Sequence, residues 1–147
     1  MTSTTTPDEP QSPALSLAAP SASIQQALEL SCLAAKIADD YRGSDTVVLD
    51  LTGVTPMFDF FVISTGTSQR QMRSLAEEIN RVLKSRGTRS NGVEGDVGSP
   101  WLLHDYGDIV VHVLSPEARQ LYNLEELWAD AKQVDWKPIA AALELPK

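Results

Sequence analysis

Residues 60–87 read FFVISTGTSQRQMRSLAEEINRVLKSRG, a strand pattern that runs directly into a helix pattern. The run Phe60-Phe-Val-Ile-Ser64 is aromatic and β-branched, and the Thr65-Gly66 that closes it predicts a strand buried on both faces. Ser68 and Gln71 have the spacing of a capping box, and the helix that follows ends at Gly87. Its apolar stripe consists of Met72, Leu75, Ala76, Ile79, Val82 and Leu83.

The sequence on either side of this unit adds further elements. Thr46-Val-Val-Leu-Asp-Leu51 predicts another strand buried on both faces. Ser23-x-x-Gln26 has the form of a capping box and begins a helix that runs to about Tyr41. Helices are also predicted over residues 116–122, with Pro116 at the first position, and over residues 124–132. Because strands and helices alternate, we expect an α/β fold, a small mixed β-sheet with flanking helices.

Residues 101–114 predict a β-hairpin in which Tyr106-Gly107 forms the turn. The expected cross-strand pairs are Trp101 with His112, Leu103 with Val110 and Asp105 with Asp108. Two carboxylates in direct opposition are unfavourable, so each either accepts hydrogen bonds from turn amides or lies at the exposed rim of a partner-binding face. His104 and His112 point to opposite faces, which argues against a shared metal site.

Composition and charge are those of one globular domain. With 147 residues, 42% of them hydrophobic and 22% charged, the chain can bury a core without metal or crosslinks. The lone Cys32 is expected to be a buried core residue. One cysteine and two histidines are too few to complete a Cys/His zinc site, and we expect no cofactor and no metal. No apolar stretch approaches the ~20 residues that span a bilayer, and we expect no membrane association. The net charge of −8 repels nucleic acid as a whole.

The chain divides into three segments. Residues 1–23 are rich in Ser, Thr and Pro and hold no Lys or Arg, which predicts a disordered tail and neither a secretion signal nor a transit peptide. Residues 24–132 are the expected folded domain, and residues 133–147 a C-terminal extension. A cytoplasmic location in a bacterium is favoured over an organellar matrix or stroma.

An enzyme is one alternative function. The loop Ser64-Thr-Gly-Thr-Ser68 precedes a helix N-terminus and could hold an anion, although a plain helix cap is the simpler interpretation. A Mg²⁺-dependent nucleotidyltransferase would use Asp59, Asp105 and Asp108. Such enzymes need paired carboxylates on one strand, normally Asp-x-Asp, and the chain contains none.

An RNA-binding module that uses the basic helix over residues 68–86 is a second alternative. Arg70, Arg73 and Arg81 lie in this helix beside Lys84 and Arg86, against only two acidic residues. These cations either form a solvated face or make local phosphate contacts. Interleaved aromatic residues, which single-strand binding usually needs, are missing from this stretch.

Aromatic and arginine residues are concentrated in the C-terminal third of the chain. Trp101, Tyr106, Arg119, Tyr122 and Trp128 are residue types that anchor protein interfaces, although they also pack in small cores.

A family resemblance rests on these residues and their neighbours. The matching string is Glu94-Gly95, Trp101, Leu103, Asp105-Tyr-Gly-Asp-Ile-Val-Val-His112, Arg119, Tyr122-x-Leu124-Glu125 and Leu127-Trp128, with Asp59-Phe-Phe-Val-Ile-Ser-Thr-Gly-Thr-Ser68 and Arg70-Gln71 upstream. It resembles the ribosomal silencing factor family, also called Iojap, over residues 24–128. Phe58 stands where the family commonly has Thr.

The resemblance implies a non-enzyme with a fold related to nucleotidyltransferases but without their catalytic carboxylates. Family members bind the large ribosomal subunit through its fourteenth ribosomal protein and block joining of the small subunit, which represses translation when nutrients are scarce. Carried over to this chain, the partner-binding residues are Trp101, Leu103, Asp105, Tyr106, Asp108, Arg119, Tyr122, Leu124 and Trp128. We also expect a homodimer that hides the apolar surface of the free protein, and a peripheral ribosomal RNA contact through Arg70, Arg73 and Arg81.

Overall fold

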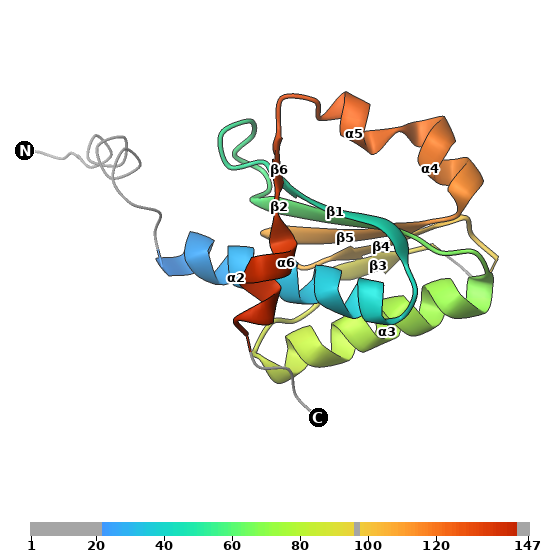
Figure 1. Ribbon diagram of the computed structural model, residues 1–147, viewed down its shortest axis with the longest axis horizontal. Coiled ribbons are helices and arrows are strands. Elements are labelled where there is room, and N and C mark those ends of the chain that lie inside the picture. The colour runs from blue at the N-terminus through green and yellow to red at the C-terminus, as the bar shows by residue number, and fades with distance from the viewer. Residues whose placement is uncertain (1–21, 96–97, 144–147) are drawn as a thin grey trace, which may run out of the picture.

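A computed structural model describes residues 22–95 and 98–143, which form one mixed sheet with helices on both faces (Figure 1). The strand order is β3-β4-β5-β2-β1-β6; β2 and β5 pair in parallel and the other neighbours are antiparallel. The strands are β1 Ser44–Asp50, β2 Phe60–Thr65, β3 Gly92–Glu94, β4 Trp101–Asp105, β5 Ile109–Leu114 and β6 Lys132–Val134. The helices are α2 Ala22–Asp40, α3 Gln69–Ser85, α4 Pro116–Tyr122, α5 Leu124–Leu127 and α6 Trp136–Ala141. The mixed sheet with flanking helices is confirmed, while the likeness to nucleotidyltransferases stays a prediction.

The β2–α3 unit has the predicted structure. All six residues of β2 are buried, and every residue of the predicted apolar stripe of α3 is buried. The backbone N–H of Gln71 donates to Ser68 Oγ at 3.1 Å, and the side-chain oxygen of Gln71 accepts from the backbone N–H of Thr67 at 2.7 Å. These side-chain bonds occupy amides at the start of α3, so the loop over residues 64–68 is a helix cap. The helix ends at Ser85, and Gly87 follows with φ +90°.

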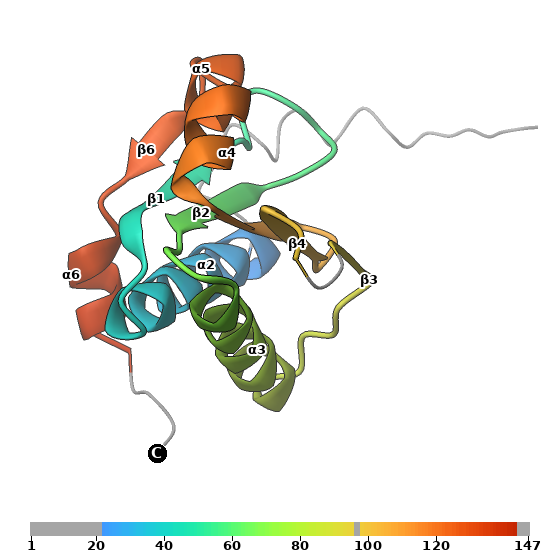
Figure 2. The ribbon, with the colours of Figure 1, turned by 90° about the vertical axis from the view of Figure 1, so that its right-hand side faces the viewer.

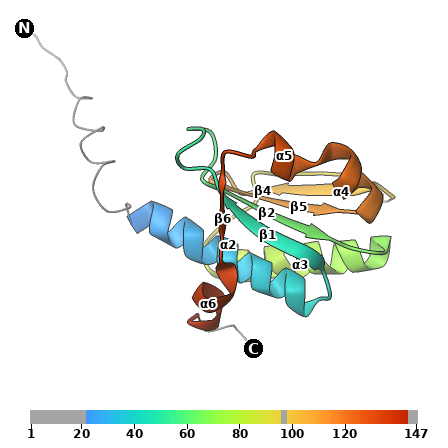
Figure 3. The same cartoon turned by 45° about the horizontal axis from the view of Figure 1, so that its top comes forward.

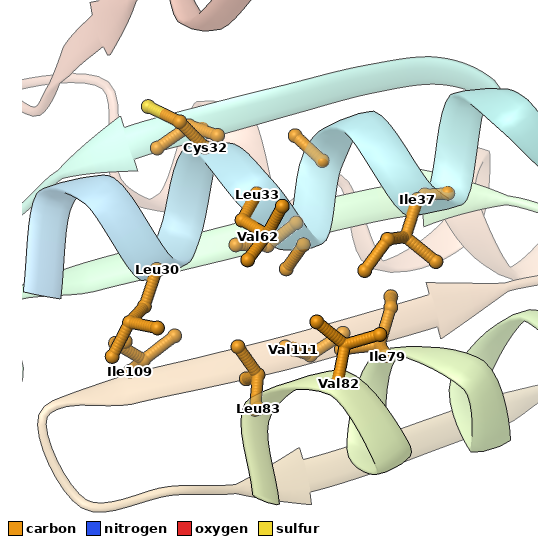
Figure 4. Close-up of a cluster of buried hydrophobic side chains, with 14 of the residues drawn as sticks. Leu30, Cys32, Leu33, Ile37, Val62, Ile79, Val82, Leu83, Ile109 and Val111 are labelled. Carbon is orange, nitrogen blue, oxygen red and sulfur yellow. The ribbon is translucent and has the colours of Figure 1, made fainter. Parts of the chain in front are cut away.

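Helices α2 and α3 cover one face of the sheet (Figure 2). In Figure 4, Leu33 and Ile37 of α2 lie opposite Val82 of α3, with Val62 and Val111 of the sheet between the helices. Cys32 is fully buried, as predicted. Burial, and secondarily the charge of Glu29, raises the pKa of its thiol to about 11, so this cysteine is a protonated core residue.

The expected start of the first helix was wrong, whereas the expected burial of β1 on both faces is confirmed in the second half of the strand. Helix α2 begins at Ala22, so Ser23 lies within the helix and is not its cap. In strand β1, Val48 is buried in the cluster on the α2–α3 face and Leu49 in the cluster on the other face, while Ser44–Val47 are less buried. The first residues of β1 lie near the rim of the sheet, where Asp45 has a positive φ and the pairing with β2 is irregular. Residues 1–21, most of the expected tail, lie outside the described residues.

The β4–β5 hairpin has the predicted faces but a different register. Trp101 pairs with Leu114, Leu103 with His112 and Asp105 with Val110, a shift of two residues from the expected pairs. The turn residues are Gly107 and Asp108, because Gly107 has φ +89° and the first turn position of this kind of hairpin favours glycine. A shift of two keeps every side chain on its predicted face. The carboxylate of Asp105 accepts from the backbone N–H of Gly107 at 2.8 Å, so its turn-amide interpretation is confirmed.

Gly107→Ala is expected to lower the free energy of unfolding by about 1 kcal/mol, because only glycine adopts this φ without strain. An added Cβ would also lie 3.2 Å from the Asn91 side-chain nitrogen. Chemical denaturation measures the change. Gly53→Ala is the matched control, since its Cβ would meet nothing within 4 Å. Equal losses in both variants would contradict the strain argument.

The C-terminal part of the chain joins the sheet and the core. The helix predicted over residues 124–132 ends at Leu127, because Lys132–Val134 pair with the edge of β1 as β6. Helix α6 then packs on α2, and the buried Trp136 donates its indole N–H to the carbonyl of Thr46 at 3.1 Å. Residues 133–147 were expected to be an extension outside the folded domain. The part of this segment that the structure describes, residues 133–143, instead belongs to the sheet and core. None of the helices in the described ranges is long and apolar enough to cross a bilayer.

Candidate functional site

The face of the sheet away from α2 and α3 carries only the short helices α4 and α5 among the described elements (Figure 3). Under them lies a second apolar cluster, built around Phe61, Ile63, Val110 and Leu114. Trp101, Leu103 and Trp128 border this cluster and stay partly exposed. Two helices of seven and four residues cannot cover six strands, so aromatic side chains form part of the outer surface.

Six rings are linked by contacts along this face, and we call them the aromatic row. Tyr122, Trp101, His112 and Phe61 touch in that order, and Trp128 and Phe58 each touch Phe61. The ring centroids of Trp101 and Tyr122 are 4.7 Å apart, and those of Phe61 and Trp128 are 5.7 Å apart with the rings edge to face. The remaining contacts, Trp101–His112, Phe61–His112 and Phe58–Phe61, span 4.6 to 5.8 Å. Phe58, the departure from the family pattern, thus extends the row.

His112 is a neutral link in the aromatic row. The indole Nε1–H of Trp101 donates to His112 Nδ1 at 3.1 Å, so Nδ1 must be the acceptor and the ring proton is on Nε2. Burial lowers the pKa of His112 to about 4. His104 lies on the opposite face of the sheet beside Tyr106, as predicted. The two histidines cannot share a metal.

Exposed apolar side chains occur within the aromatic row and next to its members in the sequence. Tyr122 is 49% exposed, and Leu121 and Leu127 are more than 70% exposed. Trp101, Leu103 and Tyr122 also line a hollow of about 320 Å³, together with Glu94 and Pro100. Sequence reasoning missed Leu121 and Leu127 as surface residues, because leucines in a short helix give no local sign of pointing to solvent.

Two of the predicted partner-binding residues are buried. Tyr106 points to the α3 side of the sheet, where its hydroxyl donates to the Asn80 side-chain oxygen at 2.9 Å and burial raises its pKa. Leu124 is 6% exposed beneath the α4–α5 pair. The structure therefore brings Trp101, Leu103, Tyr122 and Trp128 together at the surface and leaves Tyr106 and Leu124 inside the fold.

Arg119 holds α4 and α5 onto the sheet. Its guanidinium donates to both carboxylate oxygens of Glu125 at the start of α5, to Thr65 Oγ1 at 2.8 Å and to the carbonyl of Asp45 at 2.7 Å. Its side chain is only 12% exposed. Arg119 thus fixes the helix that carries Tyr122 and is a positioning residue.

Carboxylates lie at one side of the aromatic row. Asp108 is exposed in the hairpin turn, Asp105 is half-buried, and Glu94 lines the hollow beside Trp101; we call these three residues the acidic rim. The pKa of Asp59 is raised, first by burial and then by the charges of Asp108 and Asp50. No group of three His, Cys, Asp or Glu side chains within the described ranges could hold a metal ion. The triad suggested for a Mg²⁺ enzyme is therefore not assembled.

The basic side chains of α3 lie on the other side of the molecule. Arg70, Arg73, Arg81 and Lys84 are all exposed, because the buried stripe of α3 faces the sheet. Arg81 forms an ion pair with Glu78 at 2.6 Å, whereas Arg70, Arg73 and Lys84 form no ion pair with the residues the structure describes. The aromatic row and the basic helix are thus two separate surfaces.

Comparison with known proteins identifies the family. The family model "Ribosomal silencing factor during starvation" matches residues 24–145. "Ribosomal silencing factor RsfS" of Halalkalibacterium halodurans is 38% identical over 107 residues, which is 73% of this chain and 92% of that protein. A mouse protein named "Mitochondrial assembly of ribosomal large subunit protein 1" is 35% identical over 92 residues, 60% of this chain and 40% of that protein.

A solved structure agrees with these relatives. The crystal structure of a Chromobacterium violaceum protein has 39% sequence identity and a TM-score of 0.66, and the match covers 69% of this chain and 84% of that one. The sequence resemblance is thereby confirmed. The chain belongs to the ribosomal silencing factor family, whose members are regulatory proteins and not enzymes.

Proposed function

We propose that this chain represses translation under nutrient limitation by binding the large ribosomal subunit. Contact with the fourteenth protein of that subunit would place the chain where the small subunit joins and block joining sterically. The observation that carries this proposal is the aromatic row, an uncovered Trp- and Tyr-bearing surface in a chain of a silencing-factor family. The name of the mouse relative, which mentions the large ribosomal subunit, supports the choice of subunit.

The chemistry of the surface suits a basic protein partner. Aromatic side chains supply most of the binding energy in typical interfaces, and Trp101 and Tyr122 are of this type. The acidic rim beside them attracts Lys and Arg side chains of a ribosomal protein and repels the RNA phosphates around it. Steric blocking needs no catalytic group, only sufficient affinity and overlap with the small subunit.

The basic helix is a second, weaker candidate for ribosome contact. Arg70 and Arg73 are exposed and unpaired within the described ranges, whereas Arg81 is occupied by Glu78. We propose a peripheral ribosomal RNA contact through these arginines while the aromatic row holds the protein partner. Loss of this contact would reduce the salt dependence of ribosome binding, because phosphate contacts release counterions.

The free protein is proposed to reside in a bacterial cytoplasm and to form a homodimer. A second copy that packs on the aromatic row would remove its apolar side chains from water. Light scattering that gives a monomer mass across the micromolar range would contradict the dimer.

Sedimentation with separated ribosomal subunits tests the main proposal. We expect the protein to migrate with the large subunit and not with the small one, and added protein to reduce the fraction of joined ribosomes. Tyr122→Ala should weaken both effects, because this ring is half exposed in the aromatic row. Tyr41→Ala is the matched control, as Tyr41 is 42% exposed and is not part of the row. A protein that stays at the top of the gradient would refute the silencing mechanism for this chain.

A further inference from the structure

A groove lies on the opposite side of the sheet from the aromatic row; it extends from the space between α3 and the β3–β4 edge, an edge seen in Figure 2, along the exposed side of α3. It consists of two adjoining hollows, each about 380 Å³, that share Arg73 and Glu77. This volume is in the range of small-molecule sites. One hollow has mainly apolar walls, formed by Ala76, Val93, Gly95 and Leu102, with His104 among them. The other hollow is polar and is lined by Gln69, Arg70 and Ser74.

His104 is an unsatisfied polar group in the apolar hollow. It is 9% exposed, and within the described part of the chain it makes no hydrogen bond. Its Nδ1 is completely buried without a partner, whereas Nε2 is not among the fully buried atoms and is the ring nitrogen that the hollow can reach. Burial lowers the pKa of this imidazole although the charge of Glu77 opposes the shift, so the ring is neutral at pH 7. Nε2 has no partner among the described residues and can therefore form a hydrogen bond with a ligand in the hollow, while Nδ1 stays buried without a partner.

The charged groups of the groove form no ion pair within residues 22–95 and 98–143. Arg73 and Glu77 are four residues apart on α3, a spacing that allows an ion pair, and no ion pair forms between them. Lys36 and Asp40 have the same spacing on α2 and do pair, at 3.0 Å. Arg70 is one turn before Arg73 and likewise forms no ion pair with the part of the chain that the structure describes. The groove therefore offers two guanidinium groups to an anion and one carboxylate to an N–H donor.

We propose that this groove binds a small anion in which a phosphate is joined to a planar, nitrogen-bearing ring, the chemistry of a nucleoside monophosphate. The phosphate accepts hydrogen bonds from Arg70 and Arg73, whose planar guanidinium groups suit its oxygens. The ring lies against the apolar walls, where its polar edge meets His104 Nε2 and its amino group donates to Glu77. Because the aromatic row is on the other face of the sheet, this ligand and a protein partner can be bound at the same time, whereas the ligand and the proposed RNA contact compete for Arg70 and Arg73.

An NMR titration of the full chain tests the site without ribosomes, so its outcome is independent of the proposed silencing function. The probes are adenosine monophosphate, adenosine and inorganic phosphate. We expect adenosine monophosphate to shift the His104 imidazole resonances. Adenosine and inorganic phosphate should each bind about tenfold more weakly, because each makes only part of the contacts. Binding should also weaken as salt increases, since Arg70 and Arg73 are exposed.

Two charge-removing variants on the same helix complete the experiment. Arg73→Gln should raise the dissociation constant about tenfold through loss of charge-assisted hydrogen bonds. Lys84→Gln should leave it unchanged, because Lys84 is exposed and does not line the groove. The proposal is overturned if adenosine monophosphate at ~10 mM leaves the His104 resonances unshifted, because a site with a millimolar dissociation constant would be mostly occupied at that concentration. It is overturned equally if Arg73→Gln binds as tightly as the parent chain, or if inorganic phosphate binds as tightly as the nucleotide.

Discussion

Replacing Trp101 by alanine is expected to weaken binding to the fourteenth large-subunit ribosomal protein by about 2 kcal/mol or more, a typical loss at an interface hot spot. Trp101 is a partly exposed member of the aromatic row, with its ring against Tyr122 and Leu103 beside it in the same hollow. Removal of the indole deletes a large, partly exposed apolar surface that the partner could contact. Isothermal titration calorimetry with the purified ribosomal protein measures the change.

The folding role of Trp101 requires a control. Its indole N–H is the hydrogen-bond partner of the buried His112 Nδ1, so Trp101→Ala also leaves that nitrogen unpaired. Thermal unfolding must therefore show that the variant is folded at the temperature of the titration. Tyr122→Ala, which removes an exposed ring with no such bond, should weaken binding in the same direction, and Tyr41→Ala should not. Unchanged affinity in a folded Trp101→Ala protein would remove Trp101 from the binding surface.

Local sequence patterns were sufficient for the parts of the fold that form from neighbouring residues. The strand Phe60–Thr65 and the helix Gln69–Ser85 lie where the pattern placed them, since a capping box and an apolar stripe are local signals. The alternation of β4 correctly put Trp101, Leu103 and Asp105 on one face. The register of the hairpin was wrong by two residues, because a period of two does not distinguish registers that differ by two.

Features that depend on distant contacts could not be predicted in this way. Strand β6 has three residues and exists because it pairs with β1, more than eighty positions earlier in the chain. The burial of Tyr106 follows from Asn80 on α3, and the four-residue helix α5 leaves Leu127 in solvent. Composition identified the residue types of the candidate site, while the tertiary fold decided which of them reach the surface.

Arg119→Met is expected to lower the free energy of unfolding by about 2 to 3 kcal/mol, because it removes a largely buried cation that several acceptors share. The change leaves Glu125 and the buried hydroxyl of Thr65 without their partner and releases α4 and α5 from the sheet. Chemical denaturation measures the loss. We also expect weaker ribosome binding in this variant, since α4 carries Tyr122.

Arg81→Met is the matched control for Arg119→Met. Arg81 also pairs with a glutamate, Glu78, but its side chain is 55% exposed and its removal should change stability little. The pH dependence of stability gives a second readout for the Arg119–Glu125 pair. Burial alone would raise the pKa of Glu125, but the hydrogen bonds and charge of Arg119 outweigh burial and lower it below 4.5. The Arg119–Glu125 pair therefore stabilises the fold fully at a pH above the unfolded-state pKa of Glu125. This stabilisation is lost as the pH falls through the lower pKa that Glu125 has in the folded state. Arg119→Met should abolish this acid-sensitive part of the stability. If the Arg119→Met protein keeps the acid-sensitive part, or loses no more stability than Arg81→Met, then Arg119 does not hold the α4–α5 pair in place.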